Sequence, residues 1–376
     1  MKTGAFQTGI YPNYLAEVGI TDGQAREKVK KAFETIFFDP EEGFCHRTDE
    51  DAWCMVDTGN IDARTEGMSY GMMMCVQMNR KDIFDKLWTF SERYMLMKQG
   101  PNEGYFRWSV HIDGSTNSEG PAPDGEEYFA MALFMAAARW GDGEGSSNYS
   151  ARAREILRHA VHQHEIVPGG DPMWEPENKY IRFVPGMKIS DPSYHLPHFY
   201  ELFALKADEE DRAFWKQAAE ASRKYIEISA HPETGLSPEY ADYDGKTVLL
   251  FRKPWVYYSD AYRVAENIAL DHIWFGADPA LDAVETRIQD FFDRQDMDDL
   301  RAYELDGTPQ SETAMHPTAI KAVLGAASVG SSSGARIRFL KQFADLPLRK
   351  GKRRYYDNCL YFFCLLMLTG NYRIYI

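Results

Sequence analysis

The chain has 376 residues, of which 44% are hydrophobic, and carries a formal net charge of −15. This charge disfavours nucleic acid or an anionic membrane as the main partner, and no run approaches the roughly 18 apolar residues that span a bilayer. The first residues, MKTGAFQ, lack the apolar stretch of a secretion signal, and we interpret the five cysteines as reduced thiols of a cytoplasmic protein.

Apolar residues at spacings of three and four predict twelve helices along the chain. Two short β-branched or aromatic runs, at 180–184 and 247–251, look like hairpin pieces within long loops. The predicted helices cover residues 24–37, 66–78, 81–98, about 124–138, 149–165, 195–206, 209–229, 260–275, 280–293, 315–328, 335–345 and 355–369.

The predicted helices are of two kinds. Three of them are almost wholly apolar or small, from Gly67 to Met78, Ala130 to Ala138 and Leu360 to Leu368. Those at 81–98, 149–165 and 209–229 have one charged face. This alternation predicts an all-α (α/α)6 barrel, a ring of six helical hairpins with short β-hairpins in its loops. Because no linker rich in Gly, Ser or Pro divides the chain, we expect a single domain over 1–376.

Three carboxylates stand where polar turns enter apolar helices, at Glu66, Asp124 and Asp260. Each alone has a simple structural explanation, as a helix N-cap or as a partner of the helix dipole. Together, and among many aromatic residues, they favour another role. Hydrolysis of a glycosidic bond needs two carboxyl groups across the sugar, and aromatic side chains stack on sugar rings.

Four stretches carry a family resemblance: APDGEEYFA at 122–130, RTEGMSYG at 64–71, SDPSYHLPHFY at 190–200 and RRYYDN at 353–358. They resemble glycoside hydrolase family eight. Within that family they look like one branch, the reducing-end xylose-releasing exo-oligoxylanases, which share the departures from the family signature at Pro123, Glu126 and Phe129. The resemblance implies an (α/α)6 barrel and a reaction that inverts the anomeric configuration.

By this resemblance Glu66 is the general acid and Asp260 the general base. Asp124 matches the residue that holds the sugar in a distorted ring, and Tyr194 matches a tyrosine that helps to hold the attacking water. Arg263, one turn after Asp260, is expected to be its ion-pair partner, with a surface salt bridge as the plainer explanation.

The remaining substrate-binding residues that we expect are Arg64, Trp108, His316 and Tyr356. Trp108 is either a stacking platform for a sugar or a core residue. In the exo-acting branch a similar His-Pro loop closes the cleft beyond the reducing-end sugar. Met315 replaces the usual leucine beside His316, which keeps the bulk of the side chain.

The sequence therefore predicts an inverting glycoside hydrolase that removes xylose from the reducing end of β-1,4-xylo-oligosaccharides. We expect no cofactor and no metal, because the histidines at 159, 162, 164, 195 and 198 offer no completed ligand set. An endo-acting xylanase, β-1,4-glucanase or chitosanase of the same family is the first alternative. A sugar epimerase on the same toroid and a non-catalytic sugar-binding protein are alternatives of other classes.

Overall fold

The computed structural model of the chain describes residues 3–251 and 256–376, so Met1 and Lys2 of the MKTGAFQ stretch lie outside it. Helices dominate this part of the chain, and none of them is both long and apolar enough to cross a lipid bilayer. The helices are α1 (Ala5–Thr8), α2 (Asp22–Phe38), α3 (Thr65–Gln77), α4 (Lys81–Phe90), α5 (Pro123–Trp140), α6 (Tyr149–Ile166), α7 (Pro197–Lys206), α8 (Arg212–Ser229), α9 (Arg263–Phe275), α10 (Pro279–Phe292), α11 (Pro317–Ala327), α12 (Arg336–Asp345) and α13 (Arg354–Leu368).

The twelve predicted helices are all present, as α2 to α13. Their ends differ for identifiable reasons. The helix predicted over 81–98 continues past α4 as one π-helical turn and stops at Met95, because Leu96 is extended and pairs with Phe106. Helix α11 begins at Pro317 because His316 has non-helical dihedral angles, and proline suits the first position of a helix. The four residues of α1 are too few to show a periodic pattern.

Two small antiparallel sheets accompany the helices. The first has the order β1-β2-β3-β4 and the second the order β5-β6-β7. The two predicted hairpin pieces form isolated bridges instead, Trp174 with Ile181 and Ala241 with Thr247. The strands are β1 (Cys45–Arg47), β2 (Trp53–Asp57), β3 (Asp62–Arg64), β4 (Ser109–His111), β5 (Val256–Tyr257), β6 (Arg301–Glu304) and β7 (Pro309–Thr313).

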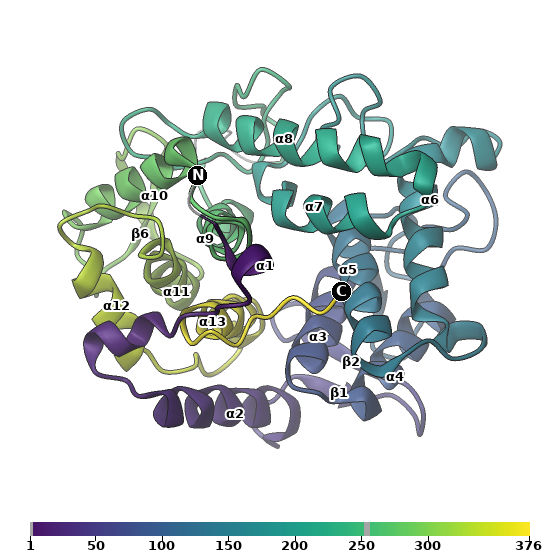
Figure 1. Ribbon diagram of the computed structural model, residues 1–376, viewed down its shortest axis with the longest axis horizontal. Coiled ribbons are helices and arrows are strands. Elements are labelled where there is room, and N and C mark those ends of the chain that lie inside the picture. The colour runs from purple at the N-terminus through teal and green to yellow at the C-terminus, as the bar shows by residue number, and fades with distance from the viewer. Residues whose placement is uncertain (1–2, 252–255) are drawn as a thin grey trace. The chain divides into compact units, whose positions relative to one another are not determined.

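The described residues form two units, each assembled from segments that are distant in sequence. Unit 1 comprises the described residues of 1–32, 188–198 and 219–373, and unit 2 comprises 33–187, 199–218 and 374–376. In unit 1, α9, α11 and α13 pack against one another (Figure 1). In unit 2, α3 packs against α4 and α5, and α5 packs against α6.

Burial separates the helices into the two kinds that the sequence predicts. In α13 every residue from Tyr355 to Leu368 is buried, and in α5 every residue from Pro123 to Ala136. By contrast, α4 buries one face only, through residues such as Ile83, Phe84 and Leu87. The same one-sided burial is seen in α2, α6, α8, α10 and α12.

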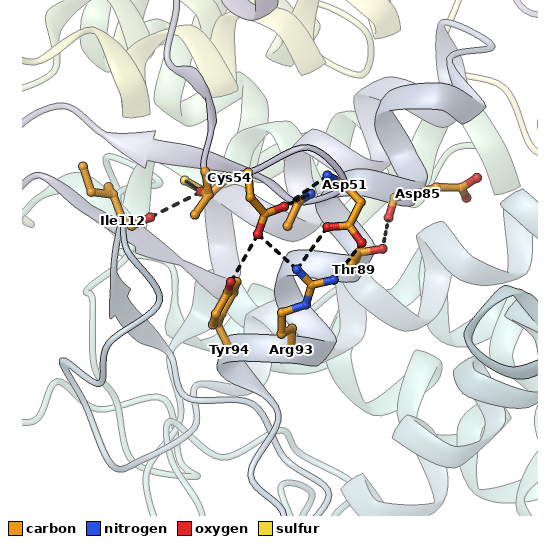
Figure 2. A network of polar contacts seen from close by, with 10 residues as sticks. Asp51, Cys54, Asp85, Thr89, Arg93, Tyr94 and Ile112 are labelled. Carbon is orange, nitrogen blue, oxygen red and sulfur yellow. Dashed lines mark hydrogen bonds and ion pairs between the residues drawn. The ribbon is translucent and has the colours of Figure 1, made fainter.

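A polar network fixes the first sheet of unit 2 to the turn after α4. Arg93 donates hydrogen bonds to Asp49 at 3.0 Å and to Asp51 at 2.8 Å, and Tyr94 also contacts Asp49 (Figure 2). Thr48, in the same turn between β1 and β2, donates to the carbonyl of Ile112. These contacts hold the β1–β2 hairpin against the segment that follows α4.

Candidate active site

The predicted site residues divide between the two units, and each group is described within its own unit. Most of them lie at or next to the start of a helix, where a loop or strand enters a buried element. Unit 2 holds Arg64, Glu66, Trp108 and Asp124, and unit 1 holds Tyr194, Asp260, Arg263, His316 and Tyr356.

Glu66 lies in the first turn of α3, directly after strand β3. Every other residue of α3 is buried, whereas Glu66 keeps part of its surface exposed. The helix dipole favours a carboxylate at this end. Partial exposure at the end of an otherwise buried helix also makes Glu66 the residue of α3 that a ligand can contact.

Arg64 is held by two carboxylates at the end of β3. Its Nε donates to Asp62 at 3.1 Å, and its terminal nitrogen forms an ion pair with Asp57 at 3.2 Å. The guanidinium carbon lies 5.3 Å from the ring centre of Trp108. These contacts fix a planar cation against one face of an indole, in an arrangement that favours cation–π attraction.

Trp108 is a surface residue in this unit. It is 37% exposed, so the alternative of a core tryptophan is wrong. Its carbonyl accepts a hydrogen bond from the backbone N–H of Thr65 at 3.0 Å. Since Thr65 immediately precedes Glu66, this bond ties the backbone of Trp108 to the start of α3.

Asp124 is the second residue of α5, and it is 7% exposed. The N-cap explanation is wrong for this residue, because the N-cap position belongs to Ala122. The backbone N–H of Gly125 donates to the Asp124 carboxylate at 3.0 Å. A Cβ on Gly125 would lie 2.3 Å from the Cβ of Thr65, so only glycine lets α5 approach the start of α3 this closely.

Glu126, which we did not predict as a site residue, is a buried carboxyl group near Asp124. One oxygen accepts the backbone N–H of Phe106 at 2.9 Å, and the other has no hydrogen-bond partner within the described residues. Burial raises the pKa of Glu126 well above its usual range, and the nearby charge of Asp124 adds to this effect. The sequence signal for it was its departure from the family signature.

In unit 1, Asp260 lies in a 3₁₀ turn, Ser259–Tyr262, that leads into α9. A terminal nitrogen of Arg263 lies 3.6 Å from its carboxylate. The plainer explanation, a surface salt bridge, is wrong because the Arg263 side chain is 4% exposed. The guanidinium carbon lies 5.4 Å from the ring centre of Tyr194. The structure therefore brings these three predicted residues together in one cluster.

Asp191 is a second buried carboxyl group that we did not predict. It is the N-cap of the 3₁₀ turn Pro192–Tyr194 and accepts the backbone N–H of Ser193 at 2.8 Å. Burial raises the pKa of Asp191 well above its usual range, the charge of Asp260 raises it further, and Arg263 opposes the shift. An aspartate directly before proline at a helix start is the sequence signal that points to this cap.

His316 is buried at the start of α11, where its Nδ1 lies 2.7 Å from the Asp357 carboxylate. Its ring centre lies 4.8 Å from that of Tyr356. The Tyr356 hydroxyl donates to the carbonyl of Ser259 at 2.6 Å. Because Ser259 precedes Asp260, a continuous run of contacts links His316 to the turn that carries Asp260.

His195 is a buried histidine with both ring nitrogens bound by hydroxyl groups. Nδ1 and Nε2 of His195 lie 2.8 Å from the Ser222 hydroxyl and 2.9 Å from the Ser190 hydroxyl, and burial lowers the pKa of His195 to about 3. Over residues 3–251 and 256–376, no group of three or more His, Cys, Asp or Glu side chains is arranged to hold a metal ion.

Comparison with known proteins identifies the family. The family model described as glycosyl hydrolases family 8 matches residues 44–370. A reducing-end xylose-releasing exo-oligoxylanase of Paenibacillus barcinonensis is 50% identical over 99% of this chain and 98% of its own, and one of Halalkalibacterium halodurans is 50% identical over 99% and 96%. The solved structure of the Paenibacillus protein complexed with xylose matches with a TM-score of 0.97 at 50% identity, over 99% of this chain and all of that one. The chain therefore belongs to glycosyl hydrolases family 8.

Proposed function

We propose that this chain is an inverting glycoside hydrolase that removes single xylose units from the reducing end of β-1,4-xylo-oligosaccharides. Similarity at 50% identity over almost the whole chain to relatives named for this activity supports the proposal. We also propose one catalytic domain over 1–376 with an (α/α)6 barrel. Alternating buried and one-sided helices support this architecture, and the family match at 44–370 includes residues of both units.

The proposed reaction is a single displacement by water. Glu66 donates a proton to the glycosidic oxygen as the bond to the leaving xylose breaks, and Asp260 takes a proton from the water that attacks the anomeric carbon. Asp124 binds the sugar at the cleavage site in a distorted ring, and Tyr194 helps to hold the water. Trp108 and Arg64 contact the sugar, and Arg263 orients Asp260.

One observation carries the reducing-end part of this proposal. The contacts from His316 through Tyr356 to Ser259 lie within unit 1 and end next to Asp260. A hydrogen-bonding imidazole tied to the turn of the general base suits recognition one sugar beyond the scissile bond. The imidazole would bind the free anomeric hydroxyl, and Tyr356 would support it. A site built to hydrogen-bond a hydroxyl strongly rejects substrates that lack it.

The alternatives from the same family and from another class have weaker support. An endo-acting enzyme needs an open cleft, and it would gain nothing from the recognition of a free reducing end that we propose for His316. An epimerase needs histidine bases, but His195 is bound at both ring nitrogens, and burial lowers its pKa to about 3. All five cysteines are present as thiols, which supports a reducing compartment, and we propose the cytoplasm.

The proposal is tested with xylotriose that carries ¹³C at C1 of its reducing-end sugar. Release from the reducing end puts the label into xylose, and release from the other end puts it into xylobiose. We expect labelled xylose, poor action on xylobiose and little action on polymeric xylan. Efficient cleavage of an alkyl or aryl glycoside of the same chain, or labelled xylobiose as the first product, would contradict the proposal.

A further inference from the structure

Two residues that the proposed mechanism does not use, Asp357 and Arg349, hold the segment before α11 in place. Asp357, in the first turn of α13, is fully buried. One of its oxygens lies 2.7 Å from Nδ1 of His316 and accepts a hydrogen bond from Arg349 at 2.6 Å. The other oxygen accepts the backbone N–H of Ala319 at 2.9 Å. The carboxylate thus joins α13, the first turn of α11 and the imidazole.

Arg349 ties Asp357 to the backbone that precedes His316. The nitrogen that contacts Asp357 also donates to the carbonyl of Met315 at 2.6 Å. The backbone before His316 and the ring of His316 are therefore tied to one ion pair. Neither partner is fully exposed, since the side chain of Arg349 is 24% exposed and that of Asp357 is not exposed at all. An ion pair screened from water in this way holds a fixed geometry better than a surface pair.

The contact with Asp357 determines which nitrogen of His316 carries the proton. A carboxylate in an ion pair only accepts hydrogen bonds, so Nδ1 of His316 must be the donor. In the neutral imidazole Nε2 is then an acceptor. Within the described part of the chain, no hydrogen-bond partner is present for Nε2, and this nitrogen is available to a ligand.

We propose that Asp357 is a specificity-determining positioning residue, which fixes His316 in the Nδ1–H tautomer so that the substrate must supply a hydrogen-bond donor. This role rests on the proposed function, in which His316 contacts the anomeric hydroxyl. A free hydroxyl donates its proton to Nε2, whereas the ether oxygen of a glycoside can only accept. Rejection of blocked reducing ends then follows from hydrogen-bond direction as well as from the size of the blocking group.

The variant Asp357→Asn tests the tautomer. The test is made in an Arg349→Met background, where the asparagine oxygen accepts the backbone N–H of Ala319 and the amide nitrogen donates to Nδ1 of His316. The proton then moves to Nε2, which can donate to an ether oxygen. We compare methyl β-xylotrioside with 1-deoxy-xylotriose, which has no anomeric oxygen. In the wild-type enzyme both should be rejected to a similar degree. In Arg349→Met/Asp357→Asn the ratio of kcat/KM for the methyl glycoside to that for the deoxy analogue should rise by about 10-fold or more over the ratio in Arg349→Met.

Two further variants distinguish the effect of hydrogen-bond direction at His316 from the effect of a rigid backbone at Met315. Arg349→Met removes the tether to Met315 but leaves Asp357 bonded to His316, so KM for xylotriose should rise while the methyl-to-deoxy ratio stays at its wild-type value. Asp244→Asn is the matched control, because Asp244 belongs to the same unit and its side chain is 79% exposed. Asp244→Asn should change neither the KM for xylotriose nor the methyl-to-deoxy ratio.

A spectroscopic measurement on the wild-type enzyme does not depend on any variant folding correctly. Long-range ¹H–¹⁵N spectra report the tautomer of each of the 10 histidines, and the signals of His316 are those missing from His316→Gln. We expect Nδ1 protonated and Nε2 unprotonated. An Nε2–H tautomer, or an unchanged ratio in folded Arg349→Met/Asp357→Asn relative to Arg349→Met, overturns this role alone. A wild-type enzyme that releases no xylose from the reducing end refutes the proposed function, and this role with it.

Discussion

The guanidinium group of Arg263 lies 3.6 Å from the carboxylate of Asp260, one helical turn away, and is almost completely buried. Burial of the cation fixes its position, so the carboxylate has a defined electrostatic partner on the side of α9 while 29% of its own side chain stays exposed. A general base needs this combination, because it must be held in one orientation and still contact a water molecule.

Asp260→Asn should reduce kcat by a factor of about 10² to 10⁴, since the amide cannot take a proton from the attacking water. The fold should persist, because asparagine keeps the shape of the side chain. Steady-state release of xylose from xylotriose measures the loss, and circular dichroism checks the fold. Activity close to the wild-type level in a folded variant would remove Asp260 from the mechanism.

Glu66→Gln should cause a loss of similar size with xylotriose, because the departing sugar is then not protonated. A substrate whose leaving group needs no proton distinguishes an acid from a base. Hydrolysis of β-xylobiosyl fluoride should be largely retained in Glu66→Gln and lost in Asp260→Asn. If both variants fail equally on the fluoride, Glu66 is not acting as a proton donor.

The positions of the helices and of the carboxylates Glu66 and Asp260 were predictable because they depend on local patterns. Glu66 and Asp260 stand where polar turns meet apolar helices, and the structure keeps both at helix starts. The sheet that carries Arg64 was missed, because its β3 strand is three residues long and polar at both ends. Short strands of this kind give no alternating pattern to detect.

Buried partners were the part that sequence reasoning missed. His316 and Asp357 are 41 positions apart, and their contact depends on how α11 packs against α13. Nothing in the sequence near either residue indicates the other. Asp191 and Glu126 look like ordinary acidic residues at helix starts, and only their burial shows that their pKa values are raised.

Trp108→Ala should raise KM for xylotriose by roughly 2- to 12-fold, which corresponds to about 0.5–1.5 kcal/mol of stacking, with a smaller change in kcat. Trp108→Phe should give an intermediate value. Trp53→Phe is a matched control, because Arg47 stacks on that indole at 4.7 Å in the same unit. Equal KM values for all three variants and the wild-type enzyme would show that Trp108 does not bind the sugar.

Glu285→Gln should make stability less dependent on pH. Glu285 is fully buried, and burial raises its pKa well above the usual range, with Asp282 adding to the shift. A carboxyl group with a raised folded-state pKa contributes stability below its unfolded pKa of about 4.3, and this stability is lost as pH rises through the folded-state value.

The glutamine stays neutral, so the Tm of the variant should rise relative to that of the wild-type protein between pH 5 and pH 8. The rise should be roughly 2 °C for each kcal/mol of difference in the free energy of unfolding. Exposed Glu144→Gln serves as the control and should show no such trend. A difference in Tm that does not change with pH would show that Glu285 is ionised in the folded protein.

Hydrolysis should invert the anomeric configuration, because Asp260 is proposed to activate water and not to attack the sugar itself. A single displacement converts the β-linkage of xylotriose into the α-anomer of xylobiose, and ¹H NMR within the first minutes detects this anomer before mutarotation mixes the two forms. The same proposal requires the carboxyl groups of Glu66 and Asp260 to lie roughly 6.5–9.5 Å apart in a crystal structure with bound substrate, which leaves room for the water. Initial formation of β-xylobiose, or a separation of about 5 Å, would instead indicate a covalent intermediate on Asp260.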